Sequence, residues 1–263
     1  MSLRDHPPVP NLPGRAPGLD GAARRELGGA FRAGGEHYDA VRPGYPDAAV
    51  DFMLPAGARD AADLGAGTGI LTALLAARGL RATAVDPSAD MLAQLRRKLP
   101  DVPAVEATAE ATGLPDAAFD AVLCAQAWHW VDPDAASAEA ARILRPGGTL
   151  GLVWNQLDVT VPWVHRLSRI MHAGDVHRPH FRPAVGPQFA EPEPLGARWD
   201  QRTTPEGLLE LAKSRSYYLR ANEATRAKVL GNLRWYLFEH LGHAPRAELA
   251  LPYFTHAWRA ARR

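Results

Sequence analysis

The chain has 263 residues, of which 22% are charged, and its formal net charge is +1 at pH 7. This length is enough to bury a full hydrophobic core, and the near-neutral charge argues against the strong basic field that nonspecific nucleic-acid binding requires. Cys124 is the single cysteine, which excludes an internal disulfide and a cysteine-based metal cluster.

Residues 1–25 are rich in proline and glycine and show no periodicity, so we expect a mobile tail there. No run of about 18 apolar residues could span a bilayer, and the first residues lack the apolar segment of a signal peptide. These features predict a cytoplasmic protein that does not enter a membrane. We divide the chain into that tail, a cofactor-binding core at 26–156, a helical cap and substrate region at 157–245, and a final strand at 246–263.

A glycine-rich segment, DLGAGTG at 63–69, lies between a short apolar run and a helical pattern at 70–78. Gly65 and Gly67 permit a backbone with positive φ and carry no Cβ, so a ligand can lie directly against the main chain. Gly79 stands where a left-handed residue would end the helix. The segment therefore predicts a strand, a glycine turn and a helix.

A second predicted strand, at 81–85, ends in Asp86, about 20 residues after the first glycine of the turn. A βαβ nucleotide site places a carboxylate at this separation, where it accepts from the 2′ and 3′ hydroxyls of an unphosphorylated ribose. The dinucleotide pattern G-x-G-x-x-G requires glycine or alanine at position 70, and this chain has Ile70. These residues favour an adenosyl ligand over NAD.

The predicted elements after Asp86 are a helix capped by Ser88, strands at 102–108 and 119–125, a helix from Asp132 to Leu144, a turn at 145–148 and a strand at 149–154. Serine and aspartate are favoured N-caps because their side chains accept from free N–H groups of the first turn. Within the strand at 119–125, we interpret Cys124 as a small buried hydrophobe. The alternation predicts a parallel, doubly wound α/β sheet.

Beyond Asn155 the pattern changes. Helical patterns occur at 161–173, 204–215 and 223–241, and we interpret them as a helical cap. The polar stretch at 174–194 is expected to be irregular. The last apolar run, at 247–258, predicts a final strand in which Pro252 indicates a bulge.

Several motifs agree in order and spacing with one family: DLGAGTG at 63–69, VDPS at 85–88, AEATGLPDAAFDAV at 109–122 and LRPGG at 144–148. Over residues 31–150 the chain resembles the class I S-adenosylmethionine-dependent methyltransferases, and within them the group that acts on small molecules. The resemblance implies a Rossmann-like, mostly parallel seven-stranded sheet with an antiparallel final strand and a helical cap between strands five and seven.

The resemblance also implies roles for individual residues. The glycine segment would hold the methionine part of S-adenosylmethionine, Asp86 would bind the ribose, and Met91 would pack on the adenine. In relatives, a segment like HYDAVRPGYP at 37–46 often covers the cofactor; here it could instead be a helix connection in which a tyrosine packs. Many relatives have aspartate where this chain has Thr108. The expected cofactor-binding residues are Tyr38, Arg42, Asp63, Gly65, Ala66, Gly67, Asp86, Pro87, Met91, Thr108, Ala109, Glu110 and Gln126.

The methyl acceptor is expected where strands four and five end, because ligands of open α/β sheets occupy the crevice at the carboxyl ends of the strands. Aromatic faces found there can contact the acceptor and attract a sulfonium cation. Ordinary core packing is the alternative for each tryptophan. The residues expected to bind the methyl acceptor are Trp128, Trp130, Trp154, Asn155 and Tyr217.

His129 is the candidate general base, because an unperturbed imidazole can accept a proton near neutral pH. The alternative role of His129 is structural, as a side chain that is hydrogen-bonded beneath the helical cap. Similar W-H-W strand ends occur in relatives such as trans-aconitate methyltransferases, whose carboxylate acceptor needs no base. For such an acceptor, Arg215 or Arg220 near Tyr217 is a candidate for a bidentate clamp.

Taken together, the residues and the resemblance predict a methyltransferase that moves a methyl group to oxygen or nitrogen of a small molecule, with a carboxylate among the acceptors, by in-line displacement. The alternatives are a nucleic-acid methyltransferase, a non-catalytic S-adenosylmethionine-binding protein and, last, an oxidoreductase. We expect no metal at His172, His177 and His180, and no nucleic-acid partner. The sequence leaves monomer and homodimer open.

Overall fold

The computed structural model describes residues 42–173 and 181–263, so the expected tail at 1–25 lies outside the described residues. A seven-stranded sheet in the order β3-β2-β1-β4-β5-β7-β6 forms its centre. β7 runs antiparallel to both of its neighbours, and the other strands are parallel to one another. The strands are β1 (Asp60–Leu64), β2 (Arg81–Asp86), β3 (Ala104–Glu106), β4 (Phe119–Ala125), β5 (Leu144–Leu157), β6 (Glu193–Thr203) and β7 (Leu249–Ala261). The predicted fold class is confirmed.

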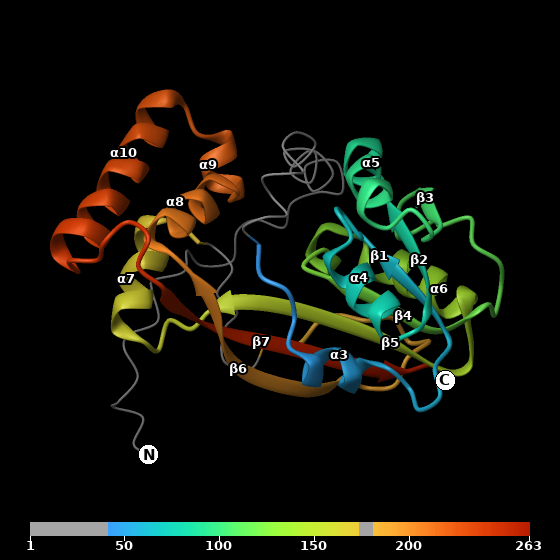
Figure 1. The fold of residues 1–263 in the computed structure, drawn as a ribbon. Coiled ribbons are helices and arrows are strands. Elements are labelled where there is room, and N and C mark those ends of the chain that lie inside the picture. Colours follow the sequence, from blue (N-terminus) through green and yellow to red (C-terminus); the bar gives the residue numbers. More distant parts are fainter. Residues whose placement is uncertain (1–41, 174–180) are drawn as a thin grey trace, which may run out of the picture.

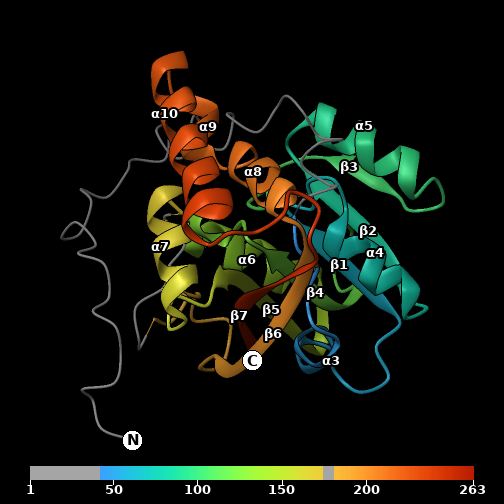
Figure 2. The same cartoon turned by 60° about the vertical axis from the view of Figure 1, so that its left-hand side comes forward.

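Helices cover both faces of this sheet (Figure 1 and Figure 2). On one face lie α3 (Asp47–Met53), α4 (Ile70–Ala77) and α5 (Ala89–Lys98), and on the other lies α6 (Pro133–Ile143). Alternate residues of one strand serve the two faces. Ala61 packs in the cluster that contains α3 and α4, whereas Ala62 belongs to the cluster that contains α6.

The predicted helix signals operate as expected. The Ser88 hydroxyl accepts from the Met91 N–H at 3.4 Å, and the Asp132 carboxylate accepts from the N–H groups of Asp134 at 3.0 Å and Ala135 at 3.1 Å. Gly79 has a φ of +78° directly after the end of α4. These contacts satisfy N–H groups that a helix leaves free at its first turn, and so fix where α5 and α6 begin.

Two expectations about strands need correction. β5 starts at Leu144, which pairs with Phe119, so the predicted turn at 145–148 is an irregularity inside β5, where the register with β4 shifts. Pro252 causes no bulge, because β7 keeps its register with β6 through the Asp200–Pro252 pair. The Pro252 carbonyl accepts from the Asp158 N–H, so it points toward the end of β5. In an antiparallel strand the nitrogen of a residue points to the same side as its carbonyl, and the proline nitrogen therefore also faces β5. The missing N–H of Pro252 costs no hydrogen bond to β6.

β6 is a strand that the sequence analysis missed. It lies at the edge of the sheet, where exposed and half-buried residues alternate along its length. Its outward side chains include Arg198, Asp200 and Arg202, and this polar half of the pattern hides the strand. The available signal in the sequence was the spacing by two of the less polar residues Leu195, Ala197 and Trp199.

The helical cap comes from two stretches of chain, one before and one after β6. Its elements are α7 (Pro162–Ile170), α8 (Pro205–Lys213), α9 (Ser216–Arg220), α10 (Glu223–Arg234) and a π-helical turn at Trp235–His240. The cap stands at the carboxyl end of β5 (Figure 1). It has its own apolar core, in which Leu167, Leu208 and Leu233 meet the end of β5 at Leu157. In the described part of the chain, no helix has the length and apolar character needed to cross a membrane.

Candidate functional site

The glycine turn joins β1 to α4 with its main chain uncovered at one point. Gly65 has a φ of +69° and Gly67 a φ of +56°. A Cβ on Gly65 would lie 2.6 Å from the Cβ of Ala127, so the turn packs directly against the chain that leaves β4. A Cβ on Gly67 would meet no atom within 4 Å, so this peptide borders open space. A ligand can therefore approach the turn at Gly67, beside Ala66.

Asp86 ends β2 next to this turn, as the sequence predicted. One carboxylate oxygen accepts from the Gly67 N–H at 2.8 Å and the other from the Ser88 N–H at 2.8 Å. The residue is 8% exposed, and burial raises the pKa of its carboxyl group while the two N–H donors lower it. Each oxygen retains further lone pairs, so the carboxylate can still accept from hydroxyl groups.

Asp63 is the most deeply buried acid of the site, with 1% of its surface exposed. Its Oδ2 accepts from the Thr72 hydroxyl at 2.6 Å, and its Oδ1 has no hydrogen-bond partner in the described part of the chain. Burial raises the pKa of Asp63 to about 7; the Thr72 hydroxyl lowers the pKa, and the charge of Asp86 raises it. An unsatisfied oxygen in such a place suits a donor from a ligand, above all a cationic one.

The residues expected around the adenine differ in their surroundings. Met91 and Ala109 are each 7% exposed, whereas Pro87 is exposed. Thr108 forms an isolated antiparallel bridge with Ala111. The Glu110 carboxylate accepts from the Asp132 N–H at 3.0 Å, which ties this segment to the start of α6.

The tips of β4 and β5 are joined to the segment before α3. Gln126 has a φ of +56°, an uncommon conformation for a residue with a side chain, and its amide donates to the Asn155 carbonyl at 3.0 Å. The Asn155 side chain donates to the Gly44 carbonyl at 2.7 Å and accepts from the Thr255 hydroxyl at 2.6 Å. The amide nitrogen and the amide oxygen of Asn155 thus connect β5 to the segment before α3 and to β7, a role that the sequence analysis did not predict.

Arg42 donates to the Ser214 carbonyl at 2.8 Å and so connects the same segment to the end of α8. Tyr38 lies outside the described residues. The Gly44 and Ser214 contacts therefore hold 42–46 between the sheet and the cap.

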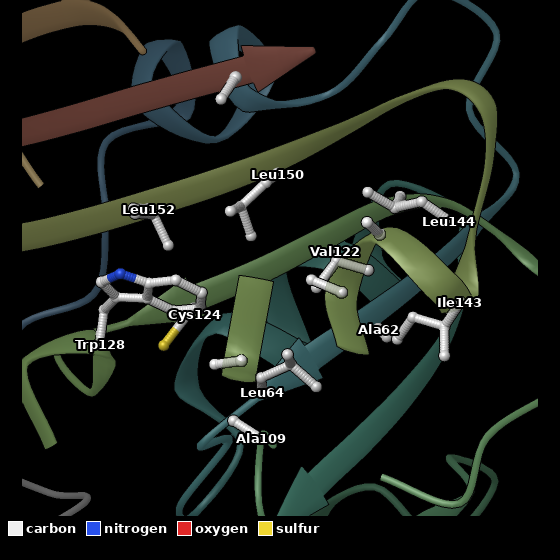
Figure 3. Close-up of a cluster of buried hydrophobic side chains, with 14 of the residues drawn as sticks. Ala62, Leu64, Ala109, Val122, Cys124, Trp128, Ile143, Leu144, Leu150 and Leu152 are labelled. Carbon is white, nitrogen blue, oxygen red and sulfur yellow. The ribbon is translucent and has the colours of Figure 1, made fainter. Parts of the chain in front are cut away.

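The tryptophans at these strand tips are mainly buried. Trp128 is 4% exposed, donates through Nε1 to the Ala184 carbonyl at 2.9 Å, and lies beside Cys124 in the core (Figure 3). Trp154 is 2% exposed, and its Nε1 donates to Nδ1 of His129 at 3.3 Å. His129 itself is exposed and contacts the half-buried Trp130, with ring centroids 4.4 Å apart. Burial raises the pKa of the Cys124 thiol, which agrees with a structural role.

Tyr217 does not join this group. It lines a cavity of the cap between α7, α9 and α10. Among the described residues, no cluster of three or more histidine, cysteine or acidic side chains could hold a metal ion, and His177 and His180 lie outside those residues. The glycine turn, Asp63 and Asp86, and the aromatic residues after β4 and in β5 thus lie at the carboxyl ends of neighbouring strands, and Tyr217 lies apart from them.

Comparison with known proteins identifies the family of this chain. A family model described as "Methyltransferase domain" matches residues 62–152. An uncharacterized methyltransferase of Mycobacterium tuberculosis is 44% identical over 239 residues, covering 90% of this chain and 98% of the relative. An uncharacterized methyltransferase-like protein of Schizosaccharomyces pombe is 40% identical over 146 residues, which is 54% of this chain and 57% of that protein.

Solved structures show the same fold. A putative type II methyltransferase from Anaeromyxobacter dehalogenans superimposes with a TM-score of 0.63 and 30% identity, covering 84% of this chain and 97% of that one. A Haemonchus contortus N-methyltransferase, solved with phosphomonomethylethanolamine and S-adenosylhomocysteine, superimposes with a TM-score of 0.50 and 15% identity over 88% of this chain and 57% of that one. This chain belongs to the class I S-adenosylmethionine-dependent methyltransferases, and S-adenosylmethionine is its cofactor.

The buried state of Asp63 gives a prediction for the cofactor-free protein. Because the pKa of Asp63 in the folded protein, about 7, exceeds the ordinary aspartate value of 3.8, the unfolded chain loses this proton first as the pH rises. The free energy of unfolding should therefore fall between about pH 4 and pH 7. Asp63→Asn keeps the shape without the charge, and should gain on the order of 2–4 kcal/mol relative to wild type across that window. Denaturant unfolding at several pH values measures this, and parallel pH curves for the two proteins would contradict it.

Proposed function

We propose that this S-adenosylmethionine-dependent methyltransferase methylates an oxygen or nitrogen of a small organic molecule bound at the carboxyl ends of β4 and β5. The carrying observation is the contact between the glycine turn and the chain after β4, where a Cβ on Gly65 would lie 2.6 Å from the Cβ of Ala127. The glycine turn thus packs against the residue that directly precedes the aromatic segment Trp128–Trp130. Donor and acceptor sites side by side are what an in-line displacement requires.

S-adenosylmethionine supplies an electrophilic methyl group on a sulfonium sulfur. On the protein side, Asp86 would accept from the ribose hydroxyls, and the unpartnered Oδ1 of Asp63 would accept from a cationic group of the methionine part. Gly67 would leave room for the ligand along the turn. Met91 and Ala109 offer buried apolar atoms to the adenine. We assign Arg42 and Asn155 as positioning residues, because their polar groups bind the protein's own carbonyls.

The hydrogen bond between Trp154 and His129 bears on the role of the imidazole. An indole N–H only donates, so Nδ1 of His129 accepts and the neutral ring carries its proton on Nε2. In this tautomer Nε2 is a hydrogen-bond donor and cannot take a proton. We therefore propose that His129 orients the acceptor by donating to it, and that the nucleophilic atom needs no deprotonation by this residue. An anionic oxygen, such as a carboxylate, meets that condition.

The assignment of Asp86 is tested by Asp86→Ala. Loss of a charged acceptor for two hydroxyl groups should weaken S-adenosylhomocysteine binding by about 2–4 kcal/mol, which is roughly 30- to 1000-fold. Calorimetry on the full chain measures the dissociation constant. Glu106→Gln is a matched control, because Glu106 is an exposed acid that pairs with Asp86 in the register of β2 and β3. Equal affinity in wild type and Asp86→Ala would refute the ribose assignment.

The role of His129 is tested once mass spectrometry has identified a methylated acceptor. His129→Asn should lower kcat by about tenfold, the loss of one hydrogen bond, and leave the shape of the pH–rate profile unchanged. His243→Asn serves as a histidine control outside the site. A loss of kcat by about a thousandfold, with disappearance of an ionisation from the pH–rate profile, would identify His129 as a base instead. Cofactor binding with no methylated product from a broad acceptor screen would contradict the proposed function.

A further inference from the structure

The cap contains a cavity of about 750 Å³ with a strongly one-sided charge. Its described lining residues are His165, Arg166, Arg169, Ile170, His172, Tyr217, Thr225, Lys228, Val229 and Asn232. They include three permanent cations and two histidines, and no aspartate or glutamate is among them. The whole chain has a net charge of only +1, so this concentration does not reflect a general excess of basic residues.

In having no carboxylate partner among the described residues, these three cations differ from several other cations of the protein. Arg145 binds Asp60 at 2.9 Å and Asp120 at 2.7 Å, as an example of the usual arrangement. Within the part of the chain that the structure describes, no ion pair involves Arg166, Arg169 or Lys228. All three side chains are exposed, so solvent weakens their mutual repulsion. Their convergence on one cavity without acidic groups still creates a positive potential that an anion can neutralise.

A structural explanation accounts for only part of the cluster. Arg169 lies in the last turn of α7, where a cation interacts favourably with the helix dipole. Arg166 contacts the faces of Trp235 and Tyr236, with its guanidinium 5.4 Å and 5.2 Å from the ring centroids. Neither effect explains Lys228, which projects into the same cavity from α10.

The other polar and aromatic side chains of the lining also suit a polar ligand. The His165 Nε2 atom is buried and has no hydrogen-bond partner among the described residues. Thr225 and Asn232 add a hydroxyl and an amide, which can donate to an anion. His172 stacks on Tyr217 with centroids 4.0 Å apart and an interplanar angle of 20°, which gives the cavity one flat wall. His172 has a φ of +48° and directly follows the C-cap of α7, a position where a left-handed residue commonly ends a helix.

We propose that this cap cavity is a binding site for a small anionic molecule that carries phosphate or several carboxylates, separate from the methyl-transfer site. Guanidinium and ammonium groups bind such oxyanions through charge-assisted hydrogen bonds. All described lining residues come from α7, α9, α10 and the residue that follows α7 by two positions, and none comes from the glycine turn or the tips of β4 and β5.

Pyrophosphate and citrate are suitable probes, and calorimetry on the full chain at low ionic strength measures their binding. At least one should bind, and its identity distinguishes phosphate from polycarboxylate recognition. The double variant Arg169→Gln with Lys228→Gln should bind it roughly tenfold more weakly or worse. The control is Arg202→Gln with Lys213→Gln, which removes one arginine and one lysine that pair with Glu248 and Glu210 outside the cavity. This control should bind like wild type.

Two further measurements test whether the cavity variant keeps its fold and its cofactor site. Without ligand, the cavity variant should melt within a few degrees of wild type, because relief of repulsion offsets the lost interaction of Arg169 with the dipole of α7. Its affinity for S-adenosylhomocysteine should be unchanged, which keeps this test independent of the proposed methyl transfer. The proposal is overturned if neither anion binds at concentrations up to about 10 mM. Equal losses in both double variants, or a parallel loss of S-adenosylhomocysteine binding in the cavity variant, would also overturn it.

Discussion

Two carboxyl groups buried at neighbouring strand tips govern the electrostatics of this protein. Asp63 and Asp86 are held by neutral donors, namely the Thr72 hydroxyl and the N–H groups of Gly67 and Ser88. No described cation accounts for the pKa shift of either acid. Burial without a counter-charge raises both pKa values and costs free energy in the ligand-free state. A cofactor that carries positive charge offsets this cost, so the arrangement favours a sulfonium and ammonium ligand over an uncharged nucleoside.

The tips of β4 and β5, where we propose that the acceptor binds, depend on strands that contribute nothing to the glycine turn. A chain of hydrogen bonds runs from the Trp199 indole to the Thr255 hydroxyl, then to the Asn155 side chain and the Gly44 carbonyl. These residues belong to β6, β7, β5 and the segment before α3. The antiparallel strand β7 therefore does more than complete the sheet. It fixes the tip of β5 next to Gln126, whose positive φ is stabilised by its bond to the Asn155 carbonyl.

Much of the core was predictable because its signals are local. The glycine turn, the caps at Ser88 and Asp132 and the strand endings each depend on a few consecutive residues, and parallel topology then brings Asp63 and Asp86 together. β6 was missed because an edge strand needs only one half-buried side. The hydrogen bonds of the Asn155 side chain and the bond from the Trp154 indole to the His129 imidazole could not be predicted, since each depends on a partner distant in the sequence. Trp128 and Trp154 illustrate this, as aromatic residues at a strand tip fit both a pocket wall and a core.

The basic cavity of the cap was hidden for the same reason. Arg166 and Lys228 are separated by 61 intervening residues, and neither periodicity nor net charge indicates that α7 and α10 face each other. The apolar cluster beneath them, which includes Leu167, Val229 and Leu233, holds the two helices together. Because this packing opposes the separation that mutual repulsion would otherwise produce, the cations stay gathered before any anion arrives. Because the hydrophobic core of the cap fixes the two helices, an anion that binds there would have to order only the exposed side chains and not the backbone that carries them.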